Sequence, residues 1–271
     1  MYTDKEDWLI DYYSRYKNFY ISGHDSFSKR IGLSNKESEY LHFIGNKKGI
    51  YAYILSIGLD FDRDLEDVKS KVEKSSLIEK IKDVFGSLHV ILYDKEVKEQ
   101  NDFWVLDSTF INMDSKSLEK YFSNINPMLT RNKGTIKNIN ASINDNFQVW
   151  GRKHLSKYIV KTDFDIFTLN NPTIFELKRV QQDTADWMPY LDDKANYRCL
   201  KKICYQKKMN LKIITYRSDI EMEVAYHKIQ KIDDDKIYGM FTLCSPKEIY
   251  KDVEDFKDVI RYESKNRRTY D

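Results

Sequence analysis

The first 125 residues alternate between stretches with apolar residues at helical spacing and short apolar runs typical of β-strands. Acidic residues at the start of residues 4–20 favour a helix there, because negative charge suits the beginning of a helix dipole. Gly86 follows a longer amphipathic stretch and marks its end. The pattern predicts helices over residues 4–20, 62–86 and 115–125, and strands over residues 49–59, 88–94 and 102–110.

From residue 126 to residue 146 the chain is rich in Asn and Ser and has little periodicity, which is typical of a linker or a long exposed loop. We therefore predict an N-terminal mixed α/β module over residues 1–125, a linker over residues 126–146 and a second domain over residues 147–271. No internal repeat is visible in the sequence. The second domain is predicted to contain strands near residues 158–169 and 173–180, a helix from its cap at Asp192 or Asp193 to about Lys208, and a strand over residues 211–217.

The composition is that of a folded globular protein, since 41% of the 271 residues are hydrophobic, 14% are aromatic and 32% are charged. No apolar run approaches the roughly 18 residues needed to span a bilayer, and the acidic N-terminus is unlike a secretory signal. The three cysteines form no CxxC pair, which argues against a disulfide framework or a structural zinc site. We expect a soluble cytoplasmic protein without membrane attachment.

The net charge is only +2, but basic residues are concentrated in two segments. Residues 127–161 contain seven basic residues and one acidic residue, and residues 198–217 contain seven basic residues and no acidic one. Residues 1–126, in contrast, contain 18 basic and 22 acidic residues. The two basic segments suit a polyanion such as nucleic acid. The alternative is that they are the ordinary solvated faces of helices and strands.

Residues 161–180, "KTDFDIFTLNNPTIFELKRV", are typical of two strands joined by an Asn-Asn-Pro turn, yet they place several charges among apolar residues. Asparagine tolerates the positive φ that a tight hairpin turn requires. If the two asparagines form the centre of the turn, Asp165 lies opposite Glu176 and Asp163 lies opposite Lys178. Glu176 and Lys178 then share one face of the strand, because side chains alternate.

Two opposed carboxylates, with Cβ atoms about 4.5–5.5 Å apart, repel each other unless a cation lies between them. A divalent metal would relieve that repulsion, with ligands from Asp165, Glu176 and the Leu177 backbone carbonyl. Asp163 is a rival ligand. The alternative is an edge hairpin on which Lys and Arg pair with the carboxylates and keep the outer face soluble.

The arrangement of Asp165, a turn, Glu176-Leu177-Lys178, a helix and a further strand resembles the PD-(D/E)xK nuclease superfamily, which includes restriction enzymes and Holliday-junction resolvases. The resemblance covers roughly residues 147–220. It implies a restriction-endonuclease-like core in the C-terminal half, with a mixed β-sheet flanked by helices. It also implies phosphodiester hydrolysis with Mg²⁺ (or Mn²⁺), in which Asp165 and Glu176 bind the metal and Lys178 orients the attacking water.

The tripeptide alone carries little information, since the chain has seven other matches to it, but only this one continues an apolar strand. Asn196 and Tyr197 on the following helix either face the site or, in the case of Tyr197, pack inward. His154 is either a phosphate contact or an exposed histidine. The residues expected to contact nucleic acid are Arg152, Lys153, Gln181, Arg198, Lys201 and Lys202.

These features predict a metal-dependent nuclease of nucleic acid, with DNA favoured over RNA as the substrate and with restriction, phage defence and DNA processing as the roles left open. The family leads us to expect a homodimer, and the acidic N-terminal module suits self-association or a protein partner. The alternative is a non-catalytic module that binds nucleic acid or protein and whose hairpin charges are structural.

Overall fold

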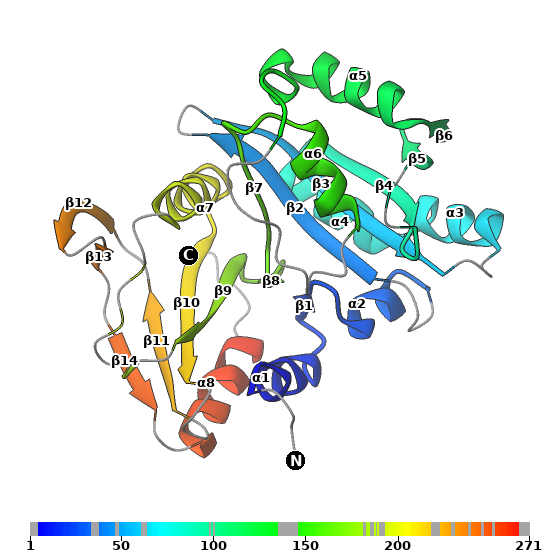
Figure 1. The fold of residues 1–271 in the computed structure, drawn as a ribbon. Helices are drawn as coiled ribbons and strands as arrows, with labels where there is room; N and C mark the ends of the chain where they lie inside the picture. Colours follow the sequence, from blue (N-terminus) through cyan, green and yellow to red (C-terminus); the bar gives the residue numbers. More distant parts are fainter. Residues whose placement is uncertain are drawn as a thin grey trace. The chain divides into compact units, whose positions relative to one another are not determined.

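The computed structural model contains two β-sheets with helices, so the mixed α+β class predicted from the sequence is confirmed (Figure 1). Contacts divide the chain into two compact units. Unit 1 comprises residues 1–21 and 164–271, and unit 2 comprises residues 22–163. The structure describes the whole chain except residues 1–4, 34–37, 47–48, 61–63, 98, 100, 135–145, 181–182, 185–186, 188, 190–192, 218–222, 229–230, 238–239, 245–246, 251–252 and 266–271.

Unit 1 is built on a six-stranded sheet with the order β1-β8-β9-β10-β11-β14. Strands β9 and β10 run parallel, and the other neighbouring pairs are antiparallel. The strands of this sheet are β1 (Phe19–Ile21), β8 (Ile166–Thr168), β9 (Thr173–Val180), β10 (Asn210–Arg217), β11 (Val224–Lys228) and β14 (Lys247–Tyr250). The remaining elements are helices α1 (Lys5–Ser14), α7 (Lys194–Lys207) and α8 (Val253–Lys265), and a two-stranded ribbon of β12 (Lys231–Ile237) and β13 (Met240–Cys244).

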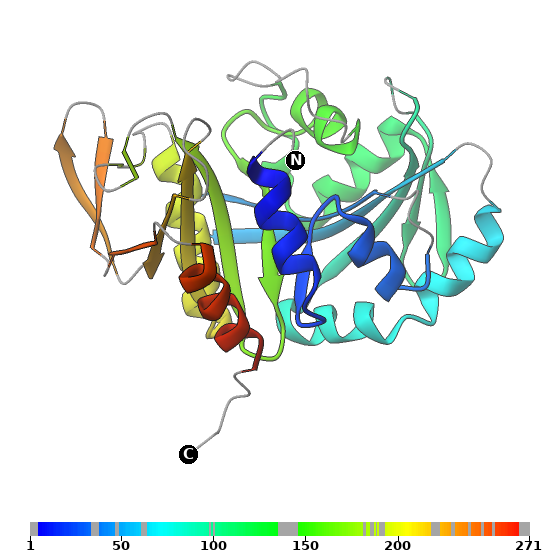
Figure 2. The ribbon, with the colours of Figure 1, turned by 90° about the horizontal axis from the view of Figure 1, so that it is seen from below.

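Helices cover both faces of the unit 1 sheet. Leu9 and Tyr13 of α1 and Phe256 and Ile260 of α8 pack in one apolar cluster with the inward side chains of the sheet. Figures 1 and 2 show α7, in yellow, on the opposite face of β9 and β10. The central strands are therefore buried on both sides, which explains why β9 and β10 are rich in apolar residues.

Unit 2 is built on a second six-stranded sheet, with the order β6-β5-β4-β3-β2-β7. Strands β3 and β4 run parallel, and the other neighbouring pairs are antiparallel. Its strands are β2 (Ser38–Asn46), β3 (Gly49–Leu59), β4 (Leu88–Asp94), β5 (Phe103–Leu106), β6 (Phe110–Met113) and β7 (Val160–Asp163). Its helices are α2 (Asp25–Arg30), α3 (Leu65–Glu73), α4 (Ser76–Phe85), α5 (Ser115–Ile125), the 3₁₀ turn η1 (Pro127–Leu129) and α6 (Asn146–His154).

Figure 2 shows the unit 2 sheet between α3 and α4 on one side and α5 and α6 on the other. Leu118 and Phe122 of α5 and Phe147 and Trp150 of α6 pack against one face of the sheet. On the other face the Phe85 ring of α4 lies 4.9 Å from the Tyr53 ring, centroid to centroid.

Local signals explain two differences from the predicted elements. The Ser75 hydroxyl accepts a hydrogen bond from the Ile78 N–H and so begins a new helix. The helix predicted over residues 62–86 is therefore two helices, the second of which ends at Gly86 with a φ of 80°, a conformation that glycine adopts without strain. The strand predicted over residues 102–110 is the hairpin of β5 and β6.

The boundaries between the two units do not lie in the predicted linker at residues 126–146. They lie after Ile21 and after Asp163. Strand β1 pairs with β8, which brings residues 1–21 into the same sheet as the C-terminal half. Helix α6 packs in the unit 2 core and β7 pairs with β2. The single strand predicted near residues 158–169 is consequently two strands in different sheets, and the change occurs at Phe164, which is fully buried.

In the part of the chain that the structure describes, no helix combines the length and the apolar character needed to cross a membrane.

The core of unit 1 contains a tyrosine whose hydroxyl group is buried away from water. Tyr13 is fully buried, and its hydroxyl has no hydrogen-bond partner among the described residues. Burial, and then the nearby Tyr226, raise its pKa well above the usual value. We expect Tyr13→Phe to raise the free energy of unfolding by about 1 kcal/mol, because a buried hydroxyl without a partner is destabilising. Urea denaturation measures the change.

The matched control is Tyr121→Phe, since the Tyr121 hydroxyl lies 2.6 Å from His89 Nδ1. Loss of that hydrogen bond should lower the free energy of unfolding by about 1 kcal/mol. If Tyr13→Phe destabilises the protein as much as the control does, the Tyr13 hydroxyl has a partner after all.

Candidate active site

Strand β9 carries the Glu176-Leu177-Lys178 motif inside the unit 1 sheet, between β8 and β10. Phe175 and Leu177 point into the core that α1 and α8 cover. Because side chains alternate along a strand, Glu176 and Lys178 project from the opposite face, which is the face that α7 covers (Figure 1). The motif therefore lies at a sheet–helix interface and not on an exposed edge.

The hairpin of β8 and β9 has the register predicted from its two asparagines. The paired residues are Ile166 with Phe175, Phe167 with Ile174, and Thr168 with Thr173. Asp165 stands one residue before the first pair, and its Oδ2 atom accepts a hydrogen bond of 2.6 Å from the Leu177 N–H. The carboxylate of Asp165 is thus fixed at the peptide that directly follows Glu176.

Glu176 is a buried carboxylate with 3% of its surface exposed. Its Oε1 atom lies 2.8 Å from the ammonium group of Lys178 and accepts a hydrogen bond of 3.4 Å from the Asn196 amide. A buried charge is costly unless it is paired and hydrogen-bonded, and these two neighbours supply both interactions.

The Lys178 side chain is 28% exposed, so its ammonium group is held between the buried carboxylate and the surface. Burial alone would lower the pKa of Lys178. The Glu176 carboxylate, followed by Tyr197 and Asp165, outweighs that effect and holds the pKa well above the usual lysine value. Lys178 is therefore protonated at neutral pH and can donate hydrogen bonds.

Helix α7 contributes two residues that the sequence had placed as candidates. Asn196 donates to Glu176, and the Tyr197 ring lies 5.9 Å from the Lys178 Nζ atom, a cation–π distance. Tyr197 is fully buried, so it both faces the motif and packs inward. Burial raises its pKa above the usual tyrosine value, so it stays a neutral phenol.

Asp163 does not have the position predicted for it. It is the last residue of β7 and pairs with His42 in the unit 2 sheet, so it does not lie opposite Lys178. The prediction was wrong because the chain leaves one sheet at Phe164 and enters the other at Ile166.

The predicted nucleic-acid contacts fall into three groups. Arg152 and Lys153 lie in the last turn of α6, in unit 2, and Lys153 Nζ is 3.7 Å from Glu99 Oε1. Arg198, Lys201 and Lys202 lie on α7 in unit 1, on the helix that also covers the motif. Gln181 lies outside the described residues.

His154 is also on α6, a helix that the sequence pattern did not indicate. Its Nδ1 atom lies 2.6 Å from Glu119 Oε1, and Lys133 contacts the other oxygen of the same carboxylate. This histidine belongs to a unit 2 ion-pair cluster. Sequence reasoning also missed Glu223, a second buried carboxylate of unit 1, whose Oε1 atom accepts hydrogen bonds from the Thr184 N–H and hydroxyl at 3.2 and 2.7 Å. Glu223 lies in a stretch of mixed polar and apolar residues, in which no motif or spacing indicates a buried carboxylate.

Oxygen atoms around the motif fit a hard divalent cation. The described residues contain no group of three His, Cys, Asp or Glu side chains that could hold a metal, but Mg²⁺ commonly needs only one or two carboxylates and keeps several waters. Asp165 and Glu176 are two such carboxylates. The buried Oδ1 atom of Asn196, which has no hydrogen-bond partner among the described residues, is a third oxygen beside them. The Leu177 carbonyl stays a predicted ligand.

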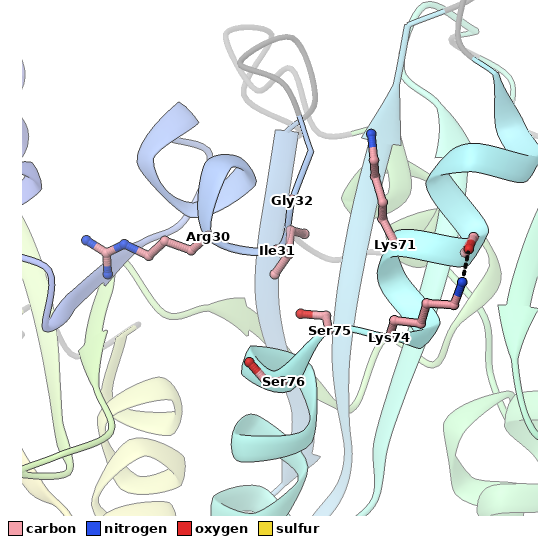
Figure 3. A pocket seen from close by; sticks show the side chains of 8 residues that line it. Arg30, Ile31, Gly32, Lys71, Lys74, Ser75 and Ser76 are labelled. Carbon is pink, nitrogen blue, oxygen red and sulfur yellow. Dashed lines mark hydrogen bonds between the residues drawn. The ribbon is translucent and has the colours of Figure 1, made fainter.

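Unit 2 has a hollow of about 420 Å³ next to the start of α4 (Figure 3). It is lined by Arg30, Ile31, Gly32, Ser70, Lys71, Lys74, Ser75 and Ser76. Figure 3 shows the Arg30 and Lys71 side chains extending in different directions. Lys71 pairs with Asp67 at 2.7 Å, and Lys74 donates to the Ser70 hydroxyl at 3.0 Å. The cations of this hollow do not converge on one point, and none of the predicted site residues lines it.

The ion pair on β9 has a measurable consequence for stability. We expect Lys178→Met to lower the free energy of unfolding by about 3 kcal/mol, because the buried Glu176 carboxylate loses its cation. The folded-state pKa of Lys178 is above its unfolded value, so its contribution is complete below about pH 10 and is lost only as the pH rises through the folded-state pKa. Urea denaturation at pH 7, where Lys178 is protonated in both the folded and the unfolded state, measures the loss.

Lys71→Met is the matched control, since Lys71 pairs with Asp67 on the surface, where both side chains are about half exposed. Exposed pairs contribute at most about 1 kcal/mol. Equal losses in the two variants would mean that the Glu176 carboxylate does not depend on Lys178.

No protein-family model, no curated protein and no solved structure matches the chain, so the candidate site stands on its own geometry.

Proposed function

We propose that unit 1 is a metal-dependent nuclease that hydrolyses phosphodiester bonds, with DNA rather than RNA as its substrate. The observation that carries the proposal is the buried Glu176 carboxylate, 2.8 Å from Lys178 on the same strand, with the Asp165 carboxylate bonded to the peptide between them. Two carboxylates and a cation on neighbouring positions of one sheet are groups that metal-dependent phosphodiester hydrolysis uses.

Each residue has a distinct task in this proposal. Asp165, Glu176 and the Asn196 Oδ1 atom would hold Mg²⁺ or Mn²⁺, which when bound supplies Lewis acidity at the phosphate and promotes ionisation of the attacking water. Lys178 would donate hydrogen bonds to that water and to the phosphate oxygens, where negative charge increases in the transition state. Water forms the new P–O bond in line with the P–O bond that breaks, it releases its proton to solvent, and the leaving oxygen takes a proton from solvent. Asn196 keeps the Glu176 carboxylate in position.

The connections of unit 1 agree with the superfamily that the motif resembles. The hairpin of β8 and β9 is followed by α7 and then by β10, which runs parallel to β9. Helix α1 and strand β1 precede this core in the chain and belong to it, since β1 pairs with β8 and α1 packs on the same sheet. The core elements thus come from both ends of the chain.

The outer face of α7 suits a nucleic-acid backbone. Residues 194–217 contain no acidic residue. Arg198, Lys202 and Tyr205 are three or four residues apart, so they share one side of the helix, and Tyr205 is 86% exposed. Cations bind phosphates and an exposed aromatic ring can stack on an unpaired base. Because Asn196 and Tyr197 of the same helix contact the motif, this face adjoins the candidate site.

A second candidate function is a non-catalytic binding module, and the direct Glu176–Lys178 pair is the observation that favours it. A structural pair would need no metal. The particular form of this alternative in which the charges solubilise an exposed edge does not hold, because β9 lies inside the sheet and Glu176 is buried. The two functions therefore differ in whether the pair takes part in chemistry.

Cleavage assays separate these functions. We expect the wild-type protein to cut DNA with Mg²⁺ or Mn²⁺ and not with EDTA, and to leave RNA uncut. Glu176→Gln and Lys178→Met should each reduce the rate at least about 100-fold, because each removes a group that acts on the developing charge. The substrates are supercoiled plasmid, linear duplex, single-stranded DNA and RNA.

Glu79→Gln serves as the control for the cleavage assay, since Glu79 is an exposed residue of α4. Circular dichroism verifies that every variant is folded. A wild-type protein that binds DNA and cuts none of the substrates, with unchanged binding in both site variants, would favour the binding module.

The α7 face is tested by binding. We expect the double variant Arg198→Ala with Lys202→Ala to bind DNA at least about tenfold more weakly. The slope of log K against log salt should become smaller by about two, because each phosphate contact contributes about 0.9 to it. Fluorescence anisotropy over a salt series measures both. Lys80→Ala with Lys82→Ala removes two charges from α4 in unit 2 as a control, and equal weakening by both pairs would show that only the net charge matters.

A further inference from the structure

The two sheets share one plan of strand directions. Read from one edge, unit 1 has the order β1-β8-β9-β10-β11-β14, and unit 2 has the order β7-β2-β3-β4-β5-β6. Neighbouring strands are antiparallel at the first two contacts, parallel at the third, and antiparallel at the last two, in both sheets. All five strand directions therefore agree between the two sheets. After the edge strand, the chain also forms the strands in the same order in both sheets.

The connections agree as well. In each unit a hairpin is followed by one or two helices and then by the strand that runs parallel to the second strand of the hairpin. Two more antiparallel strands and a final helix follow, and this helix is α8 in unit 1 and α5 in unit 2. Strand β4 begins at Leu88 and β10 at Asn210, and β5 begins at Phe103 and β11 at Val224, so both strands recur after about 120 residues. The ribbon of β12 and β13 is an addition of unit 1 between β11 and β14.

The faces of the sheets correspond too. In unit 1 the final helix α8 shares its face with α1, which directly precedes the edge strand β1. In unit 2 the final helix α5 shares its face with α6, which directly precedes the edge strand β7. The crossover helices α7 in unit 1, and α3 and α4 in unit 2, lie on the opposite faces (Figure 2).

The face of β9 that bears Glu176 and Lys178 therefore corresponds to the face of β3 that packs on α4. Tyr53 contacts Phe85 of α4. Leu55 and Ile57, which follow it at every second position of the strand, point to the same side. These three residues are buried and apolar. If the residues of β9 are matched to residues of β3 two positions earlier or later, this face of β3 still has no carboxylate and no lysine.

One acidic residue stands on the corresponding face of the neighbouring strand. Glu39 of β2 pairs with Ile57 in the ladder and is fully buried. The Ser28 hydroxyl donates a hydrogen bond of 2.5 Å to its Oε2 atom. In unit 2 this face thus has one carboxylate held by a hydroxyl, where unit 1 has two carboxylates and a lysine.

We infer that unit 2 is a non-catalytic counterpart of unit 1, built on the same strand plan, and that the chain has a single catalytic centre, which cuts one DNA strand per binding event. The inference rests on the proposed function of unit 1. The two strands of a duplex run in opposite directions, so one copy of the chain must release the DNA and bind it again before it can cut the second strand, whereas a homodimer would have a centre for each strand.

The test is cleavage of supercoiled plasmid with Mg²⁺ under conditions in which excess competitor DNA, added after binding, allows one encounter. We expect the monomer, isolated by size-exclusion chromatography, to form nicked circles first and to give linear DNA only without competitor. Glu176→Gln should produce neither product and should bind no Mn²⁺ in titration calorimetry. Glu39→Gln, the matched buried glutamate of unit 2, should cut and bind Mn²⁺ as wild type does.

Linear DNA formed by the monomer as fast as nicked circles, cutting or Mn²⁺ binding that survives Glu176→Gln, or loss of cutting in a folded Glu39→Gln protein would each overturn the single-centre inference while leaving a nuclease. A wild-type protein that neither cuts plasmid nor binds Mn²⁺ would overturn the proposed function itself, and the inference with it. The Mn²⁺ measurement on Glu176→Gln decides the question even if Glu39→Gln fails to fold.

Discussion

The ion pair of Glu176 and Lys178 is the constraint around which unit 1 is arranged. Strand β9 lies between two other strands and under α7, so water does not solvate the Glu176 carboxylate. A charge in such a place is costly unless its neighbours compensate for it. Lys178 supplies the opposite charge, Asn196 supplies a hydrogen bond, and Asp165 fixes the peptide between the two charged residues. Apolar residues of similar size would often be no less stable there, so the charges call for an explanation in function.

The hairpin that presents this pair could be predicted because its information is local. Two asparagines set the turn, and the alternation of β9 sets which residues share a face. The strand before it could not be predicted correctly, because residues 160–168 contain no glycine or proline that would mark a break between β7 and β8. The break exists only because β7 pairs with β2 and β8 pairs with β1, and such long-range pairing leaves no local pattern.

The same limit explains the domain boundaries. The stretch after residue 126 has the composition of a linker, yet α6 packs on the preceding sheet and β7 is its edge strand, and β1 completes the sheet of the C-terminal half. Arg152 and Lys153 follow that stretch closely in sequence and therefore seemed to belong with the hairpin. Their helix packs through Phe147 and Trp150 on the other core. Composition identifies a polar segment, but it does not say which sheet receives the strand that follows.

The shared strand plan of the two units is hidden in the sequence for a related reason. A sheet requires hydrogen-bonding backbones and alternation, and different side chains meet both requirements. At the face where unit 1 buries Glu176 and Lys178, unit 2 buries Leu55 and Ile57, each of which gains about 1.5–3 kcal/mol by leaving water. Unit 2 thus gains hydrophobic stability at positions where unit 1 must compensate a buried charge. At this face of the shared strand plan, unit 2 therefore takes an apolar form and unit 1 a charged one.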